Sequence, residues 1–119
     1  MQKIDTQAAA AFKYGKPFNQ GNTTITIEGG AVTMRLHGHI IAKMLGNTLV
    51  LTLAGYNTRT TRARLNGILD TLRMVENCRY TQKDFAAVLH YGKDKHDISA
   101  ASWQHFTRAS VYAPWIYKD

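Results

Sequence analysis

An alternation of apolar and polar side chains over residues 23–53, interrupted by Gly29-Gly30 and Gly46-Asn47, constrains the fold more than any other feature. Both dipeptides are signals for tight hairpin turns. Folding the chain about them brings apolar residues opposite one another, as a one-sided sheet requires: Ile27 with Val32, Ile25 with Met34, Met44 with Leu49, Ala42 with Leu51, and Ile40 with Leu53. We therefore predict an antiparallel β meander with one apolar face.

Six apolar residues of this segment occupy even-numbered positions: Val32, Met34, Leu36, Ile40, Ala42 and Met44. Residues 31–45 are therefore predicted as one long strand that bends at Gly38. Its other face would carry Arg35, His37, His39 and Lys43. The two histidines would point the same way, but two imidazoles are too few for a closed zinc site. We expect a polar sheet face there, with no metal and no cofactor.

Helices are predicted on both sides of the meander. Residues 1–14 favour a helix that ends at Gly15 and Pro17. A second helix, over about residues 59–76, begins near Thr58 or Thr60 and carries an apolar stripe of Leu65, Ile68, Leu69 and Leu72. Packed on the sheet, this stripe would close an α+β core, and 119 residues suffice for a single domain over residues 1–119.

The last third of the chain permits two interpretations. Residues 79–91 fit either a helix capped by Thr81 or strand structure, with Phe85, Ala87, Leu89 and Tyr91 alternating before a turn at residues 92–94. We favour strand structure because residues 91–95 resemble a hairpin loop. Residues 100–109 favour a short helix with Trp103 and Phe106 facing inward. Pro114 restricts the aromatic segment after it to a sheet edge or a loop.

Positive charge is concentrated in the middle of the chain. Fifteen lysines and arginines against eight acidic residues give a net charge of +7. No carboxylate occurs between Glu28 and Asp70, a stretch that carries Arg35, Lys43, Arg59, Arg62 and Arg64. A domain this basic attracts polyanions, so we expect a polyanion to meet this region.

The segment from Thr58 to Arg64 lies where the second helix is predicted to begin. A helix start presents unpaired N–H groups, and the hydroxyls and guanidiniums here would add further donors, a combination suited to phosphate. The candidate nucleic-acid or anion-binding residues are Arg59, Thr60, Thr61, Arg62, Arg64, Arg73, Arg35 and Lys43. The alternative is a solvated helix face whose arginines cover the margin of the core.

Aromatic residues gather near the end of the chain, among them Trp103, Tyr112, Trp115 and Tyr117. Together with Arg108 and Lys118 they could stack the bases of a single strand or bind a protein partner. The alternative is that most of these rings complete a small core.

Catalytic signals are sparse. The sequence has no nucleophile elbow, P-loop or HExxH pattern, and Cys78 is its single cysteine, so we predict no enzymatic activity. No apolar stretch is long enough to span a bilayer and no signal peptide is recognised, so we expect a soluble intracellular protein that does not bind membranes.

Several short motifs occur in one order over roughly residues 16–70: Gly21-Asn22-Thr23, His37-Gly38, Gly55-Tyr56-Asn57-Thr58, and the segment from Thr60 to Asn66. In these motifs the chain resembles a group of small tailed-bacteriophage proteins. The resemblance implies a phage origin and a role in the cytoplasm of the infected bacterial host, and it transfers no catalytic residues.

We therefore expect a non-enzymatic phage accessory protein that binds nucleic acid, DNA or RNA, through phosphate contacts of a basic helix. The alternative is an anti-defence protein, such as an anti-CRISPR inhibitor, that binds a host protein or ribonucleoprotein. An exposed hydrophobic sheet face would in addition imply a homodimer.

Overall fold

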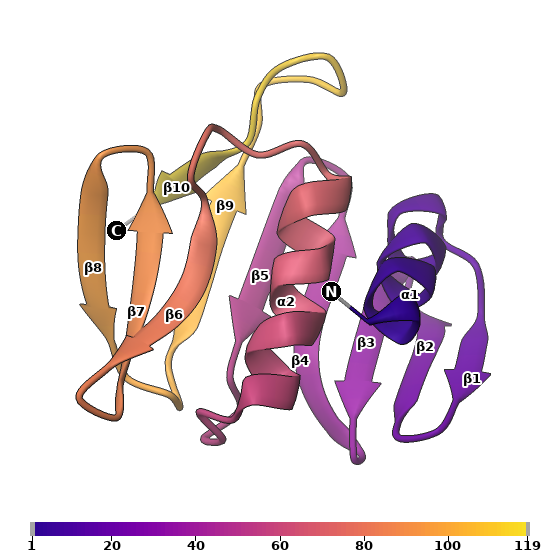
Figure 1. Cartoon of the computed structure of the whole chain (residues 1–119). Helices are drawn as coiled ribbons and strands as arrows, with labels where there is room; N and C mark the ends of the chain where they lie inside the picture. Colours follow the sequence, from indigo (N-terminus) through magenta and orange to yellow (C-terminus); the bar gives the residue numbers. More distant parts are fainter. Residues whose placement is uncertain (1, 119) are drawn as a thin grey trace.

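Both helices lie on the same face of a seven-stranded antiparallel sheet (Figure 1), in a computed structural model that describes residues 2–118. The helices are α1 (Lys3–Tyr14) and α2 (Arg59–Thr71). The large sheet has the order β1-β2-β3-β4-β5-β9-β10, and its strands are β1 (Phe18–Gln20), β2 (Thr23–Glu28), β3 (Ala31–Leu36), β4 (His39–Leu45), β5 (Thr48–Thr52), β9 (Trp103–Thr107) and β10 (Ile116–Lys118). A three-stranded sheet is formed by β6 (Arg79–Lys83), β7 (Ala86–Tyr91) and β8 (Asp94–Ile98). The predicted α+β class is confirmed.

The hairpins about Gly29-Gly30 and Gly46-Asn47 form in the predicted registers. Ile27 pairs with Val32 and Ile25 with Met34 across the first, and Met44 with Leu49 and Ala42 with Leu51 across the second. The expected pairing of Ile40 with Leu53 is absent, because β5 ends at Thr52 and its pairing with β4 begins at Ala42 and Leu51.

The prediction of one long strand over residues 31–45 is wrong. His37 and Gly38, with φ of 52° and 82°, form a two-residue turn, and β4 runs back antiparallel to β3. Positive φ at both central positions suits the twist of a hairpin, and histidine tolerates this conformation better than most residues. The register then shifts, because Met34 pairs with Ala42 while Arg35 pairs with Ile40, so Ile41 is left as an extra, buried residue of a β-bulge.

The helix ends have identifiable caps. Gly15 ends α1 in the left-handed conformation at φ 64°, and Thr58 caps α2 by accepting a hydrogen bond from the Thr61 N–H. The predicted extension of the second helix to residue 76 is wrong. Arg73 is left-handed at φ 56°, and the N–H of Met74 donates to the carbonyl of Leu69, so a Schellman motif ends the helix.

The small sheet packs against the large sheet and α2 through specific contacts. The buried Tyr80 hydroxyl of β6 donates to Gln104 of β9 at 2.8 Å, and Asn66 of α2 exchanges two hydrogen bonds with the backbone of Tyr80. The strand interpretation of residues 79–91 is thus confirmed.

The helix predicted over residues 100–109 is wrong, because residues 103–107 form β9 beside β5. Strand alternation turns Gln104 and Phe106 inward and leaves Trp103 43 % exposed, so the expectation that Trp103 faces inward is also wrong. Pro114 lies in the loop before β10, which forms an edge of the large sheet as predicted. Within residues 2–118, neither helix is long and apolar enough to cross a membrane.

The two helices approach each other most closely at Gly67. A Cβ atom at this position would lie 2.8 Å from the backbone oxygen of Asp5 and 3.6 Å from the Cβ of Ala9. The backbone of α1 cannot move aside as a flexible side chain would. The absence of a side chain at Gly67 is therefore what permits the observed contact between α1 and α2.

We predict that Gly67→Ala lowers the free energy of unfolding by about 1–3 kcal/mol, the usual effect of overpacking a core. The loss should appear as a lower midpoint of urea denaturation with an unchanged slope. Thr6→Ala, at an exposed position of α1, is the control for helix propensity alone. A gain of about 1 kcal/mol from Gly67→Ala, which alanine gives over glycine in an uncrowded helix, would show that the helices do not touch at this point.

Candidate nucleic-acid interface

Arg64 is buried, contrary to the expectation that it faces solvent with the other arginines of the helix start. Its guanidinium forms an ion pair with the buried carboxylate of Asp5 in α1 and donates to the Thr23 hydroxyl at 3.0 Å. Asn22 accepts a further hydrogen bond from it. Because its charge is neutralised inside the protein, Arg64 is a structural residue and not a phosphate ligand.

The predicted sheet residues Arg35 and Lys43 lie away from the helix start. They alternate with Met34 and Ala42, which are buried under the helices, so their side chains belong to the opposite face of the large sheet. Arg35 pairs with Glu28, and this hydrogen-bonded contact lowers the pKa of the glutamate to about 2. The Arg35 charge is thus compensated, whereas Lys43 is exposed.

Arg73 also lies apart from the other candidates. It follows the end of α2, and a helix of this length is about 20 Å long, so Arg73 and Arg59 are at opposite ends. Thr61 is buried and hydrogen-bonds the cap residue Thr58, which leaves Thr60 as the exposed hydroxyl of the first turn.

Arg59 and Arg62 remain at the start of α2 as cations without a carboxylate partner among the described residues. Arg59 is exposed. The guanidinium of Arg62 donates to the backbone carbonyl of Asn57 at 3.1 Å, to the Asn57 side chain and to Gln82. Partial burial, and then the positive charge of Arg59, lower the pKa of Arg62. These neutral partners hold the guanidinium in place without neutralising it.

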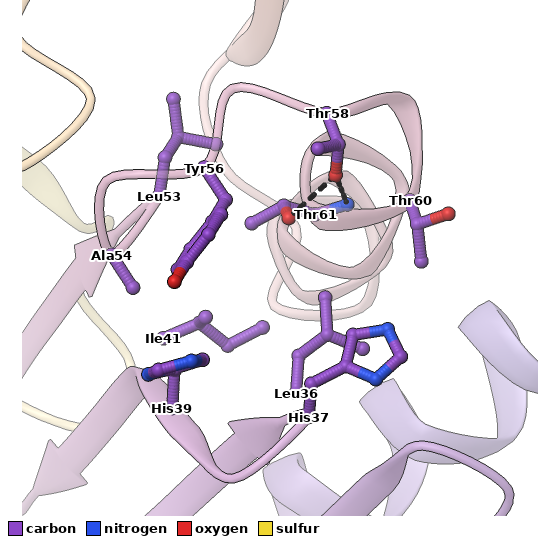
Figure 2. Close-up of a pocket in the computed structure, with 10 residues that line it drawn as sticks. All are labelled: Leu36, His37, His39, Ile41, Leu53, Ala54, Tyr56, Thr58, Thr60 and Thr61. Carbon is purple, nitrogen blue, oxygen red and sulfur yellow. Dashed lines mark hydrogen bonds between the residues drawn. The ribbon is translucent and has the colours of Figure 1, made fainter.

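A pocket of about 440 Å³ lies beside this first turn of α2 (Figure 2). We call it the α2 pocket; it is lined by Leu36, His37, His39, Ile41, Leu53, Ala54, Tyr56, Thr58, Thr60 and Thr61. Threonines line it on the α2 side and histidines on the side of the β3–β4 turn, and apolar residues such as Leu36 and Ile41 lie between the two groups. The ring of His39 lies 5.0 Å from that of Tyr56, which is half exposed.

Tyr56 and Phe85 are candidate interface residues that the sequence analysis missed. Phe85 is 91 % exposed in the β6–β7 turn, and its carbonyl accepts a hydrogen bond from the Asn57 side chain at 3.2 Å. The turn therefore lies directly beside the segment that lines the α2 pocket, although about thirty residues of chain separate the two. No local pattern in the sequence indicated this neighbourhood, because it arises from the packing of the small sheet beside the β5–α2 loop.

The four predicted C-terminal aromatics do not form one surface. Trp115 is buried, and the guanidinium of Arg108 lies 4.3 Å from its ring centroid. Tyr117 packs among Phe106 and other rings near β9. Trp103 is partly exposed at the start of β9, and Tyr112 is 96 % exposed in the β9–β10 loop. The expectation of a shared partner surface is therefore wrong for Trp115, which belongs to the core.

Groups that could support other chemistry are dispersed. Burial raises the pKa of the Cys78 thiol to about 12, which disfavours the reactive thiolate. His37 lies in a turn beside Asn22 and His39 faces Tyr56, so the two imidazoles do not form the strand pair that was expected. Among residues 2–118, no three histidine, cysteine or acidic side chains gather as a metal site would require.

Comparison with known proteins identifies a phage family. A family model described as Kyanoviridae Gp96 protein matches residues 1–110. Neither a curated protein nor a solved structure matches the chain.

We predict that Arg64→Met lowers the free energy of unfolding by about 3–5 kcal/mol, because the Asp5 carboxylate would remain buried without its partner. Combining Asp5→Leu with Arg64→Met should lose less than the two single losses together, and a double-mutant cycle of urea denaturation measures this coupling. Arg35→Met, which removes one partner of the exposed pair with Glu28, is the matched control and should change stability little. Strictly additive losses at Asp5 and Arg64 would contradict the assignment of a buried pair.

Proposed function

The chain belongs to the Kyanoviridae Gp96 protein family of phage proteins, and from this origin and the charges at the start of α2 we propose that it is a non-enzymatic protein that binds nucleic acid through phosphate contacts. The binding residues are Arg59, Thr60 and Arg62. The place of action is the cytoplasm of the infected host cell.

The pair of uncompensated guanidiniums carries this proposal. Arg59 and Arg62 repel each other, and this repulsion contributes to the lowered pKa of Arg62. A phosphate bound between them would relieve that repulsion and accept charge-assisted hydrogen bonds. Because Arg62 is already held by Asn57 and Gln82, binding would order fewer side-chain rotamers than on a free surface.

The charge of the whole chain supports the same ligand. A net charge of +7 attracts a polyanion over distances of about a Debye length and accelerates its encounter with the protein. Contacts to phosphate carry no sequence information, so this binding would be largely independent of base sequence.

A second candidate function is inhibition of a host defence protein or ribonucleoprotein. It is favoured by the exposed apolar side chains Val111 and Tyr112, which are 64 % and 96 % exposed in the β9–β10 loop. A pull-down from host lysate separates the two functions. This candidate is favoured if one host protein is still recovered after nuclease treatment and is no longer recovered with the Tyr112→Ala variant. Nuclease-sensitive recovery favours nucleic-acid binding.

We predict that Arg59→Gln and Arg62→Gln each reduce the slope of log K against log salt concentration by about one unit. The measurement is fluorescence anisotropy of a labelled oligonucleotide over a salt series. Arg73→Gln, which removes an exposed arginine at the opposite end of α2, is the matched control and should leave the slope unchanged. Equal slopes for all four proteins would exclude a role for the α2 start in phosphate binding.

A further inference from the structure

Phe85 has a backbone conformation that is unfavourable for a residue with a bulky side chain. It is in the β6–β7 turn, where Asp84 and Phe85 have φ of 52° and 68°. Positive φ at both central positions is typical of the type I′ hairpin turn, in which glycine is the favoured second residue. A bulky side chain at positive φ is strained. Since the ring is 91 % exposed, core packing does not offset that strain.

The strained turn lies beside the α2 pocket. The Asn57 side chain bonds to the Phe85 carbonyl, and Asn57 is the residue between Tyr56 and Thr58 of the pocket lining. Gln82 of the same hairpin also accepts from Arg62 at 3.3 Å. In Figure 1 the β6–β7 turn and the β5–α2 loop lie at the same end of the molecule. Two exposed aromatic rings, Tyr56 and Phe85, thus accompany the uncompensated arginines.

The pocket has the composition of a site for a flat aromatic ring. Its volume of about 440 Å³ is within the range of small-molecule sites. Leu53 and Ala54 contribute apolar surface, and the rings of His39 and Tyr56, which are tilted by 38° to each other, form one side. Thr60 and His37 add polar side chains to the lining.

The charges around the pocket favour an anionic ligand. Hydrogen bonds join residues 53–62 to 82–86 and to 99–103, and residues 37–39 line the pocket beside them. These segments carry Arg59, Arg62 and Lys83 against one carboxylate, Asp84.

We propose that the α2 pocket receives one unpaired base of a single-stranded nucleic acid, and that neighbouring bases stack on Tyr56 and Phe85. This inference rests on the proposed function, because the arginines would bind the phosphates of the same strand. Proteins that bind single-stranded nucleic acid combine a basic groove along the backbone with aromatic rings on which successive bases stack. A duplex keeps its bases paired and stacked, so it can use the arginines but neither the pocket nor the rings.

The test compares single-stranded and duplex ligands on variants that retain the arginines. The probe is a fluorescently labelled oligothymidylate of about 15 nucleotides, near the upper site size of single-strand binding modules. The comparison ligand is a duplex of equal length. We expect the wild-type protein to bind the single strand at least about tenfold more tightly. Phe85→Gly and Tyr56→Ala should each weaken single-strand binding by about five- to a hundred-fold and leave duplex binding unchanged.

Phe85→Gly has a second expected effect that a merely structural residue would not show. Because glycine relieves the strained turn, this variant should unfold at a temperature a few degrees higher than the wild type while it binds the single strand less well. Phe85→Ala removes the ring without relieving the strain and should reproduce the binding loss alone. Tyr112→Ala, which removes a ring of similar exposure in the β9–β10 loop, is the matched control and should bind normally.

The outcomes separate this inference from the proposed function. Equal binding of single strand and duplex, with no loss in Phe85→Gly, would overturn the inference and leave phosphate binding intact. Absence of binding to either ligand at low salt would overturn both. Weaker single-strand binding in the two ring variants, with unchanged salt slopes, would support the pocket and the rings as a base-binding site.

Discussion

The ion pair between Asp5 and Arg64 joins the first helix to the second inside the protein, and the position of the candidate interface depends on it. Removing two charges from water is unfavourable unless their hydrogen bonds are satisfied, and here Thr23 and Asn22 satisfy further donors of the guanidinium. The pair lies one helical turn from Gly67, where the helix backbones come close. Together these contacts hold the start of α2 above the β3–β4 turn, where the α2 pocket forms.

The local fold could be predicted wherever turn chemistry and alternation agreed, as at Gly29-Gly30 and Gly46-Asn47. The misread region, residues 31–45, has a physical explanation. A two-residue turn at His37-Gly38 exchanges the odd and even positions that face the helices, and the bulge at Ile41 exchanges them again. Val32, Met34, Leu36, Ala42 and Met44 therefore share one face and even numbers, and the pattern imitates one uninterrupted strand. Strand β9 was missed because pairing with β5, a non-local contact, overrides the local preference of residues 100–109.

The candidate site was predicted only in part, because counting charges along the sequence does not show which arginines form ion pairs with carboxylates. Arg64 precedes Ile68 by four residues, so the two share a helix face, and Asp5 shares the apolar face of Ala8, Ala9 and Phe12. A carboxylate in that position requires a buried partner, and this was the available signal for the pair. By contrast, the neighbourhood of Phe85 and Asn57 follows from packing of the small sheet, which no local pattern encodes.

Two departures from local preference occur at the same end of the molecule. Arg62 keeps its charge beside Arg59 although burial and repulsion disfavour it, and Phe85 keeps an exposed ring where a turn favours glycine. Two other arginines are paired with carboxylates, Arg64 with Asp5 and Arg35 with Glu28. Sequences depart from their own folding preferences mainly where function requires it. The two departures here favour different ligand groups, because the unpaired Arg62 would bind an anion and the exposed Phe85 ring would bind a flat apolar surface. A nucleotide strand supplies both within one repeating unit, which is why a single ligand accounts for features that a free phosphate or an apolar molecule would explain only separately.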